Sequence, residues 1–419
     1  MAMKVLWTAN ILFPEAKALL EGKKMDLASS GGWLVAAAEA LASKDDIELH
    51  VACPAAVTSI QYLKGESIHF HLFPGLQSSG EPFYGDKPEL DSVFRTLIES
   101  VKPDIIDIHG SEYAHSLSCL RAAGDIPAVL TLQGFLHECA EHYHDGLSKW
   151  TILSHKRLFK KGILQEEESF RSRGEVEKKL LSQVRHFIGR TEWDKACSLR
   201  FSPEADYHIC NESLRDAFYE GCWRWEDCRR HSIFISQGSY PLKGLHQLLK
   251  AMRGILDKYP DTIVYIGGAK ITEGRKKHLS NYGRIIASMI RRYHLSEHIR
   301  FTGALGTSDM KEQFLKATVF VCPSSIENSS NSLAEAQILG VPCVASRRGG
   351  TPSLIPNEQM GLLYDFDDTK ALGSCICRVF ESSDTFDNAP MRQTALERHD
   401  RQHNCEALVK IYDEIINNG

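Results

Sequence analysis

Two glutamates separated by seven residues, Glu327 and Glu335, are the side chains of this chain best placed to do chemistry. An apolar run that ends at Pro323 precedes them, and a helix-like segment that stops at residues 340–342 follows them. This pattern predicts a strand, a polar loop, a helix and a second strand, with one carboxylate in the loop and one on the helix. The start of such a helix presents unpaired backbone amides and a positive dipole end, which suit an anion such as a diphosphate.

Each of the two carboxylates could also bind a polyol. An ionised glutamate only accepts hydrogen bonds, whereas a vicinal diol offers two donors. An anion joined to two polyols is the chemistry of a nucleotide sugar. The alternative is that the spacing arises by chance and that Glu335 is an exposed helix residue.

The residues around this pair resemble the retaining glycosyltransferases of family four, which have the GT-B fold. The resemblance covers the C-terminal half of the chain well and the N-terminal half more loosely. The matching residues are Pro323, Ser324, Glu327, Asn331, Ser332, Leu333, Glu335, Ala336, Gly340 and Pro342, together with 243–244, 265–268, 301–303, 347–352 and 361–364.

Alternating strand-like and helix-like segments form two sets along the chain, and the second opens after the tryptophan-rich stretch 222–227. Such alternation favours parallel sheets covered by helices on both faces. With the resemblance, it predicts an α/β protein of the GT-B type, with two Rossmann-like doubly wound parallel-sheet domains facing a central cleft. We expect an N-terminal acceptor-side domain at 1–215 and a C-terminal nucleotide-sugar domain at 216–419, whose last helix could pack back on the first domain.

The resemblance implies a role for each donor-side residue. Glu335 is expected to take the ribose hydroxyls, Glu327 the hydroxyls of the transferred sugar, and the amides around Asn331, Ser332 and Leu333 the diphosphate. In the first domain, Gly31 and Gly32 are similar to a glycine loop that lets the backbone approach the β-phosphate, although an ordinary strand–helix turn would look the same. Gly267 belongs to a further donor-side motif.

Lys243 matches a basic loop that holds the donor diphosphate in this family. The chemistry needs cations there because negative charge grows on the leaving phosphate. Gln237 stands about where the family has an arginine. We expect Arg190, which follows a strand of the first domain, to replace that charge, unless it is paired with Glu192 or Asp194.

Three polar residues are candidates for the acceptor side. His109 and Glu112 follow a predicted strand at 105–108, so His109 is expected to contact the donor sugar or the acceptor, or else to be a satisfied structural histidine. Gln133 replaces a histidine that many relatives carry after the next strand. A glutamine can bind a sugar hydroxyl but cannot move a proton near neutral pH. Retaining relatives need no dedicated base, because the departing phosphate oxygen can take the acceptor proton.

Composition and motifs exclude several other classes of protein. The chain has 419 residues, 43% hydrophobic content and a net charge of −5, and it lacks nucleic-acid-binding signatures. Its twelve cysteines include no Cys-x2-Cys pair, which favours reduced thiols in the cytoplasm. We see no signal peptide and expect no metal and no cofactor: His137 and His142 are five positions apart, and the acidic run at 365–368 reads as a surface loop.

The stretch 149–164 mixes large apolar side chains with five cations. Such a stretch could lie on an anionic membrane or could form a surface helix packed on its domain.

The sequence therefore predicts a cytoplasmic, metal-independent, retaining hexosyltransferase. Its donor would be a UDP-sugar, with GDP-mannose as the other option, and its acceptor a glycan or lipid-linked glycan of bacterial surface polysaccharide synthesis. Two alternatives keep the fold: a catalytically silent binding subunit, suggested by Gln237 and Gln133, and a nucleotide-sugar epimerase or hydrolase.

Overall fold

The computed structural model describes residues 2–22, 32–76, 85–156, 162–275, 278–382 and 384–418. It divides into two compact units. Unit 1 comprises Met1–His137, Arg171–Leu214 and His399–Gly419, and unit 2 comprises Glu138–Phe170 and Arg215–Arg398. The units differ from the expected segments 1–215 and 216–419 in three places, because 138–170 and Arg215 belong to unit 2 and 399–419 belong to unit 1. Whether the two expected segments are separate domains stays a prediction.

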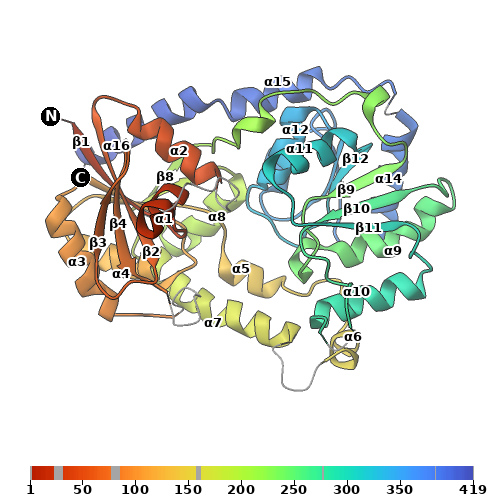
Figure 1. Ribbon diagram of the computed structural model, residues 1–419, viewed down its shortest axis with the longest axis horizontal. Helices are drawn as coiled ribbons and strands as arrows, with labels where there is room; N and C mark the ends of the chain where they lie inside the picture. Colours follow the sequence, from red (N-terminus) through yellow and green to blue (C-terminus); the bar gives the residue numbers. More distant parts are fainter. Residues whose placement is uncertain are drawn as a thin grey trace. The chain divides into compact units, whose positions relative to one another are not determined.

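Unit 1 is built on an eight-stranded sheet with the order β3-β4-β2-β1-β5-β6-β7-β8 (Figure 1). Every neighbouring pair is parallel except β3 with β4, so an antiparallel strand closes one edge. The strands are β1 (Met3–Thr8), β2 (Ile47–Ala55), β3 (Gln61–Lys64), β4 (His69–Pro74), β5 (Ile105–His109), β6 (Ala128–Thr131), β7 (His186–Gly189) and β8 (Asp206–Ile209).

Helices cover both faces of this sheet, and α2 and α16 lie on the opposite side from α3 and α4 (Figure 1). The helices with residues in unit 1 are α1 (Pro14–Glu21), α2 (Gly32–Ala42), α3 (Glu89–Val101), α4 (Ala114–Ala123), α5 (Leu136–Glu141), α7 (Ile163–Leu181), α8 (Glu192–Phe201) and α16 (Arg401–Asn418), of which α5 and α7 continue into unit 2.

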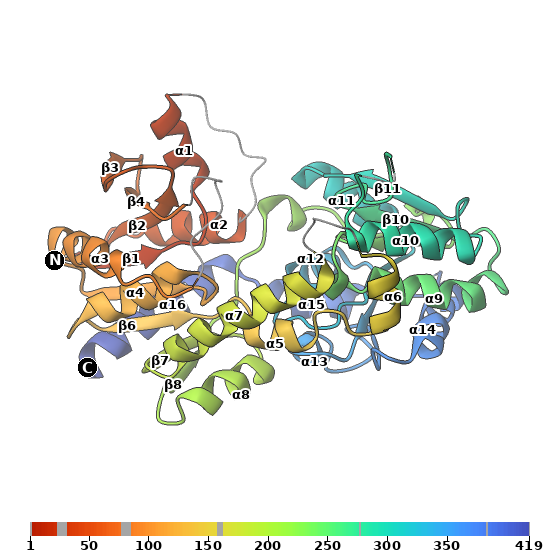
Figure 2. The same cartoon turned by 90° about the horizontal axis from the view of Figure 1, so that it is seen from below.

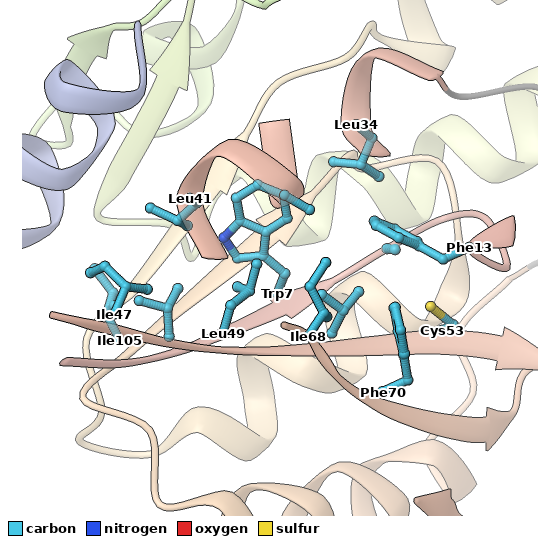
Figure 3. Packing of buried hydrophobic residues seen from close by; sticks show 14 of the residues in the cluster. Trp7, Phe13, Leu34, Leu41, Ile47, Leu49, Cys53, Ile68, Phe70 and Ile105 are labelled. Carbon is cyan, nitrogen blue, oxygen red and sulfur yellow. The ribbon is translucent and has the colours of Figure 1, made fainter. Parts of the chain in front are cut away.

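The core of unit 1 follows the alternation of side chains along its strands, because successive residues point to opposite faces of the sheet. In β1, Val5 and Trp7 belong to the cluster under α1, α2 and α16, whereas Leu6 belongs to the cluster under α3 and α4. Figure 3 shows Trp7 close to Leu41 and Leu49 within the first cluster. Because both faces are buried, these strands read as continuous apolar runs in the sequence.

A buried polar network ties α16 to the sheet. The indole N–H of Trp7 donates to the hydroxyl of Tyr412 at 2.9 Å, and that hydroxyl donates to Asp107 at 2.5 Å. Thr131 donates to the other oxygen of Asp107 at 2.6 Å. The carboxylate is fully buried, so these donors offset the cost of removing it from water.

Unit 2 contains a six-stranded parallel sheet with the order β11-β10-β9-β12-β13-β14. Its strands are β9 (Ser232–Ile235), β10 (Ile263–Gly267), β11 (Ile299–Gly303), β12 (Val319–Cys322), β13 (Cys343–Ser346) and β14 (Leu362–Tyr364). Its helices are α6 (Lys149–Ser154), α9 (Leu245–Leu256), α10 (Asn281–Arg292), α11 (Thr307–Lys316), α12 (Asn331–Leu339), α13 (Thr351–Leu354), α14 (Thr369–Ser382) and α15 (Ala389–Arg398), with 3-10 turns η1 (Asp216–Phe218), η2 (Trp225–Asp227) and η3 (Pro241–Lys243). In this unit α9 packs against α14 (Figure 2), and α12 packs against α15.

The expected fold class, two α/β units with doubly wound parallel sheets, is confirmed. The antiparallel edge strand β3, the helix α1 and the edge strand β14 are among the elements that the sequence pattern did not indicate. The stretch 149–164 does not form one helix, because α6 ends at Ser154 and α7 begins at Ile163, while 157–161 lie outside the described residues. Among the described residues, no helix is long and apolar enough to cross a membrane.

Candidate functional site

The loop between β12 and α12 carries the two candidate carboxylates of unit 2. Ser330 caps α12, because its hydroxyl accepts a hydrogen bond from the amide of Leu333. The helix ends where Gly340 adopts a left-handed conformation with φ 82°. Asn331 and Ser332 are therefore the first two residues of the helix, where backbone amides lack intrahelical acceptors. The expected helix start is present at this point in the chain, although the Leu333 amide is already engaged. Binding of a diphosphate by these amides stays a prediction.

Glu327 and Lys243 form an ion pair at the end of β12. The ammonium of Lys243 lies 2.5 Å from Oε1 of Glu327, and the hydroxyl of Ser324 donates to the same oxygen at 2.7 Å. The two side chains are 25% and 15% exposed. Burial by itself disfavours the charge of Lys243, but the Glu327 carboxylate outweighs burial and raises the pKa of the ammonium. Lys243 is therefore a firmly held cation at this site.

Gly244 explains why the lysine loop can lie so close to β12. Its φ of 68° is left-handed, and a Cβ at this position would meet the carbonyl oxygen of Pro323. The amide of Ser325 donates to the carbonyl of Leu242 at 2.8 Å, which fixes the same contact from the other side. In the Lys-Gly pair, Lys243 thus supplies a charge and Gly244 permits the close approach of two backbone segments.

A second glycine turn holds the backbone of Glu327. The amide of Gly350 donates to the Glu327 carbonyl at 2.9 Å. Gly349 has φ 56°, and a Cβ there would meet the same carbonyl. The conspicuous Arg-Arg-Gly-Gly stretch therefore supports the loop that carries Glu327.

Glu335 is buried on α12, with 2% of its surface exposed. Arg215 grips it with two parallel bonds, Nε to Oε1 and Nη2 to Oε2, each 2.7 Å long. Burial raises the pKa of Glu335, and the guanidinium opposes that rise. The alternative that Glu335 is an exposed helix residue is wrong.

Gln237 turns back on its own loop. Its side-chain oxygen accepts hydrogen bonds from the amides of Gly238 and Ser239 and from the Ser239 hydroxyl, at 3.0, 3.2 and 2.8 Å. The following strand reaches this loop through Gly267, because a Cβ there would meet the backbone of Ser236. Gln237 and Gly267 thus shape the ends of β9 and β10.

Comparisons with known proteins show what this part of the chain is similar to. Residues 229–382 match the family described as "Glycosyl transferases group 1". The match lies within unit 2. The chain is 32% identical over 143 residues to a putative glycosyltransferase, YtcC, of Bacillus subtilis (strain 168), which covers 33% of this chain and 34% of that protein. The chain thus spans about a third of the length of this curated relative, and assignment to family four stays a prediction.

Solved structures resemble this chain over almost its whole length. Sucrose-phosphate synthase from Thermosynechococcus elongatus has a TM-score of 0.72 at 16% identity, covering 100% of both chains. Anabaena HepE in complex with UDP and glucose has a TM-score of 0.65 at 15% identity, covering 98% of this chain and 99% of that one. These similarities show that the fold is GT-B.

In unit 1, His109 ends β5 and is 4% exposed. Its ring lies 4.2 Å from the ring of Trp7, and its Nε2 is 3.5 Å from a carboxylate oxygen of Asp107. Within the described residues neither ring nitrogen has a hydrogen-bond partner. Burial lowers the pKa of His109, and Asp107 opposes that shift. Whether His109 contacts a ligand or has a structural role stays a prediction.

Arg190 also lies in unit 1, where its side chain is 4% exposed. Its guanidinium pairs with Glu212 and donates to the carbonyl of Leu132, while its backbone amide donates to Asp194 at 3.1 Å. The side-chain partner is thus Glu212, which the sequence did not indicate. Whether Arg190 replaces the missing charge at Gln237 stays a prediction.

Glu112 and Gln133 follow β5 and β6 in the same unit. Burial raises the pKa of Glu112 to about 7. Its Oε2 lies over Gly110, where φ is 88° and a Cβ would meet both this carboxylate and Gln133. The structure therefore brings these two acceptor-side candidates to one turn.

The expected glycine loop falls only partly within the described residues. Gly31 lies outside the described residues, and Gly32 is the first residue of α2. Among the described residues, no group of three or more histidine, cysteine, aspartate or glutamate side chains could hold a metal ion.

Two charged residues beside the candidates were missed by sequence reasoning. Arg215 contacts Glu335, and the fully buried carboxylate of Glu177 accepts hydrogen bonds from Ser111 at 2.6 Å and from the His137 amide at 2.9 Å. Arg215 lies in an irregular stretch, and Glu177 sits among charged neighbours that resemble a solvated helix. The local sequence gives no signal for either contact.

Proposed function

We propose that this protein is a retaining glycosyltransferase that moves a hexosyl unit from a nucleoside-diphosphate sugar to a glycan or lipid-linked glycan. The observation that carries the proposal is the cluster in unit 2. Lys243 is paired with Glu327, and α12, which begins a few residues after Glu327, carries Glu335. The match of residues 229–382 to the group 1 family supports the same reaction.

Each part of the donor has a counterpart in this cluster. The first-turn amides of α12, at Asn331 and Ser332, would accept the diphosphate, and Lys243 would stabilise the charge that grows as the glycosidic bond breaks. Glu327 would then bind hydroxyls of the transferred sugar, while Glu335 would bind the ribose. The positive charge comes from the protein itself, so we propose that the reaction needs no metal.

Retention follows from the family resemblance. The departing phosphate oxygen would take the proton of the acceptor hydroxyl, so no protein base is required. Gln133, which cannot move a proton near neutral pH, is compatible with that course. We infer that His109, Glu112 and Gln133 contribute polar contacts on the acceptor side.

The donor we favour is a UDP-sugar, with GDP-mannose as the other option. HepE, a protein of similar fold, has been solved with UDP and glucose. We propose a cytoplasmic enzyme of bacterial surface polysaccharide synthesis that touches the inner face of the membrane. On α6, Trp150 and Leu153 are 80% and 51% exposed, which supports contact with a lipid surface.

A catalytically silent nucleotide-sugar-binding subunit is the second candidate. The observation that favours it is Gln237, whose side-chain oxygen is committed to its own loop and supplies no cation. Slow hydrolysis of the donor without acceptor would distinguish an enzyme from a silent subunit. An epimerase or hydrolase of the same fold would instead convert the nucleotide sugar without any acceptor.

The first experiment is thermal unfolding of the wild type and Glu335→Ala with UDP, GDP, ADP and their sugar conjugates. A ligand at a hundred times its dissociation constant should add about 2.7 kcal/mol to stability. We expect UDP or UDP-sugars to stabilise the wild type and the variant to lose that effect. No stabilisation by any of these nucleotides would contradict the proposed function.

A further inference from the structure

The ion pair between Arg215 and Glu335 has no role in the reaction proposed above. The two side chains are 28% and 3% exposed, and they are 120 positions apart in the chain. Both guanidinium nitrogens that face the carboxylate lie 2.7 Å from an oxygen, one nitrogen to each oxygen. This planar, two-point contact fixes both the direction and the rotation of the carboxylate.

The guanidinium is itself held in place. It lies 4.6 Å from the centre of the Phe218 ring, and Phe218 packs edge-on against Phe314 at 5.8 Å. Phe314 in turn packs against Phe234 of the central strand β9 at 5.0 Å. A series of aromatic contacts therefore connects the Arg215 guanidinium to the sheet, so the core of unit 2 fixes its position.

The pair also determines the charge of Glu335. A carboxylate with so little exposed surface tends to become protonated, and a protonated acid offers fewer acceptor sites to a diol. Within the described residues, Arg215 is the charged group that opposes this tendency. Each carboxylate oxygen has two lone pairs, so one bond from Arg215 to each leaves one acceptor site on each.

We propose that Arg215 is a positioning residue for nucleotide recognition: it holds Glu335 ionised and oriented so that both ribose hydroxyls can donate to it. This inference rests on the proposed function. The ligand would be a ribonucleoside diphosphate. Arg215 and Glu335 would together determine the preference for a nucleotide that carries a 2′-hydroxyl.

The test compares UDP with 2′-deoxy-UDP by calorimetry between pH 5.5 and 8.5, on the wild type, Arg215→Gln and Arg215→Lys. Arg215→Gln should weaken UDP binding roughly tenfold at neutral pH, since a hydrogen-bonded charge is lost. Without the guanidinium the pKa of Glu335 rises further, so the loss of UDP affinity on acidification should begin at a higher pH. The preference for UDP over 2′-deoxy-UDP should shrink in the same variant.

Arg215→Lys keeps the charge but not the two-point contact. It should retain the pH profile of the wild type and still lose part of the preference for the 2′-hydroxyl, which separates the electrostatic effect from the geometric one.

Arg392→Gln is the matched control. Arg392 also supports α12, through its bonds to the carbonyls of Ile338 and Gly221 at 3.0 and 2.9 Å, but these bonds go to backbone oxygens. This variant should lose stability while its pH profile and its preference for UDP stay unchanged. A purely structural role for Arg215 would make the two glutamine variants behave alike.

Three results would overturn the inference. Tighter UDP binding by Arg215→Gln would mean that the arginine competes with the ribose. An unchanged preference for UDP over 2′-deoxy-UDP in this variant would mean that Arg215 does not orient the carboxylate of Glu335. A wild type that binds none of UDP, GDP and ADP would overturn the proposed function and this inference together, whereas either of the first two results would leave the proposed function standing.

Discussion

The two units hold their charged candidates in different ways. In unit 2 each candidate carboxylate meets a cation from a distant segment, Glu327 with Lys243 and Glu335 with Arg215, beside a helix start that can receive an anion. In unit 1 Arg190 is committed to Glu212 and a backbone carbonyl, and His109 is enclosed by Trp7 and Asp107. A polar residue at the carboxyl end of a strand is therefore not enough to define a ligand contact. The rest of its hydrogen-bonding capacity must also face the ligand.

Arg190→Met offers the largest test of this comparison. The side chains of Arg190 and Glu212 are 4% and 10% exposed, so the variant leaves a buried carboxylate without its guanidinium. Removing one member of such a pair should lower the free energy of unfolding by about 3–5 kcal/mol. Urea unfolding measures this loss. If Arg190 serves only as the partner of Glu212, UDP affinity stays within about twofold of the wild type, a difference of ~0.4 kcal/mol.

Gln237→Arg provides the companion variant. A large loss of UDP affinity in Arg190→Met that is restored by adding Gln237→Arg would show that the two positions compensate. A residue of unit 1 would then supply the charge missing from unit 2.

The pH dependence of stability gives a second test, through Glu112. Its pKa is about 7 in the folded protein against 4.5 for an ordinary glutamate. Between these values the folded protein binds more protons than the unfolded chain, so this residue makes stability fall as pH rises from 4.5 to 7. Relative to Glu112→Gln, the wild type should lose on the order of 1–3 kcal/mol over that window. Parallel stability curves for the two proteins would show that the carboxyl is not held in its protonated form.

Two glycine substitutions in unit 2 give the smallest expected effects, and they should have opposite signs. Gly244→Ala places a Cβ against the Pro323 carbonyl at a left-handed residue, so it should cost about 1–3 kcal/mol and weaken UDP binding through displacement of Lys243. Gly254→Ala, on the exposed side of α9 with no atom within 4 Å of the new Cβ, should stabilise by about 0.5–1 kcal/mol. Thermal unfolding checks both, and a neutral Gly244→Ala would show that the lysine loop does not depend on this close approach.

Much of the fold could be predicted from local sequence. The buried parallel strands appear as apolar runs because both faces of each sheet are covered, and the strand expected at 105–108 is observed as β5 (Ile105–His109). The strand β3 was missed because its four residues are largely exposed and lack that pattern. The helix α1 was missed because Pro14 and a short length give it little periodic signal.

The sequence by itself determined the order of elements, the family resemblance and the candidate donor residues, because glycines, prolines and a helix cap act over a few neighbouring positions. Only the tertiary structure decided which charges meet. Arg215 with Glu335 and Arg190 with Glu212 are contacts between segments far apart in the chain, and their formation depends on how the sheets bring those segments together. Coulomb attraction and burial act through space, so no local pattern records them.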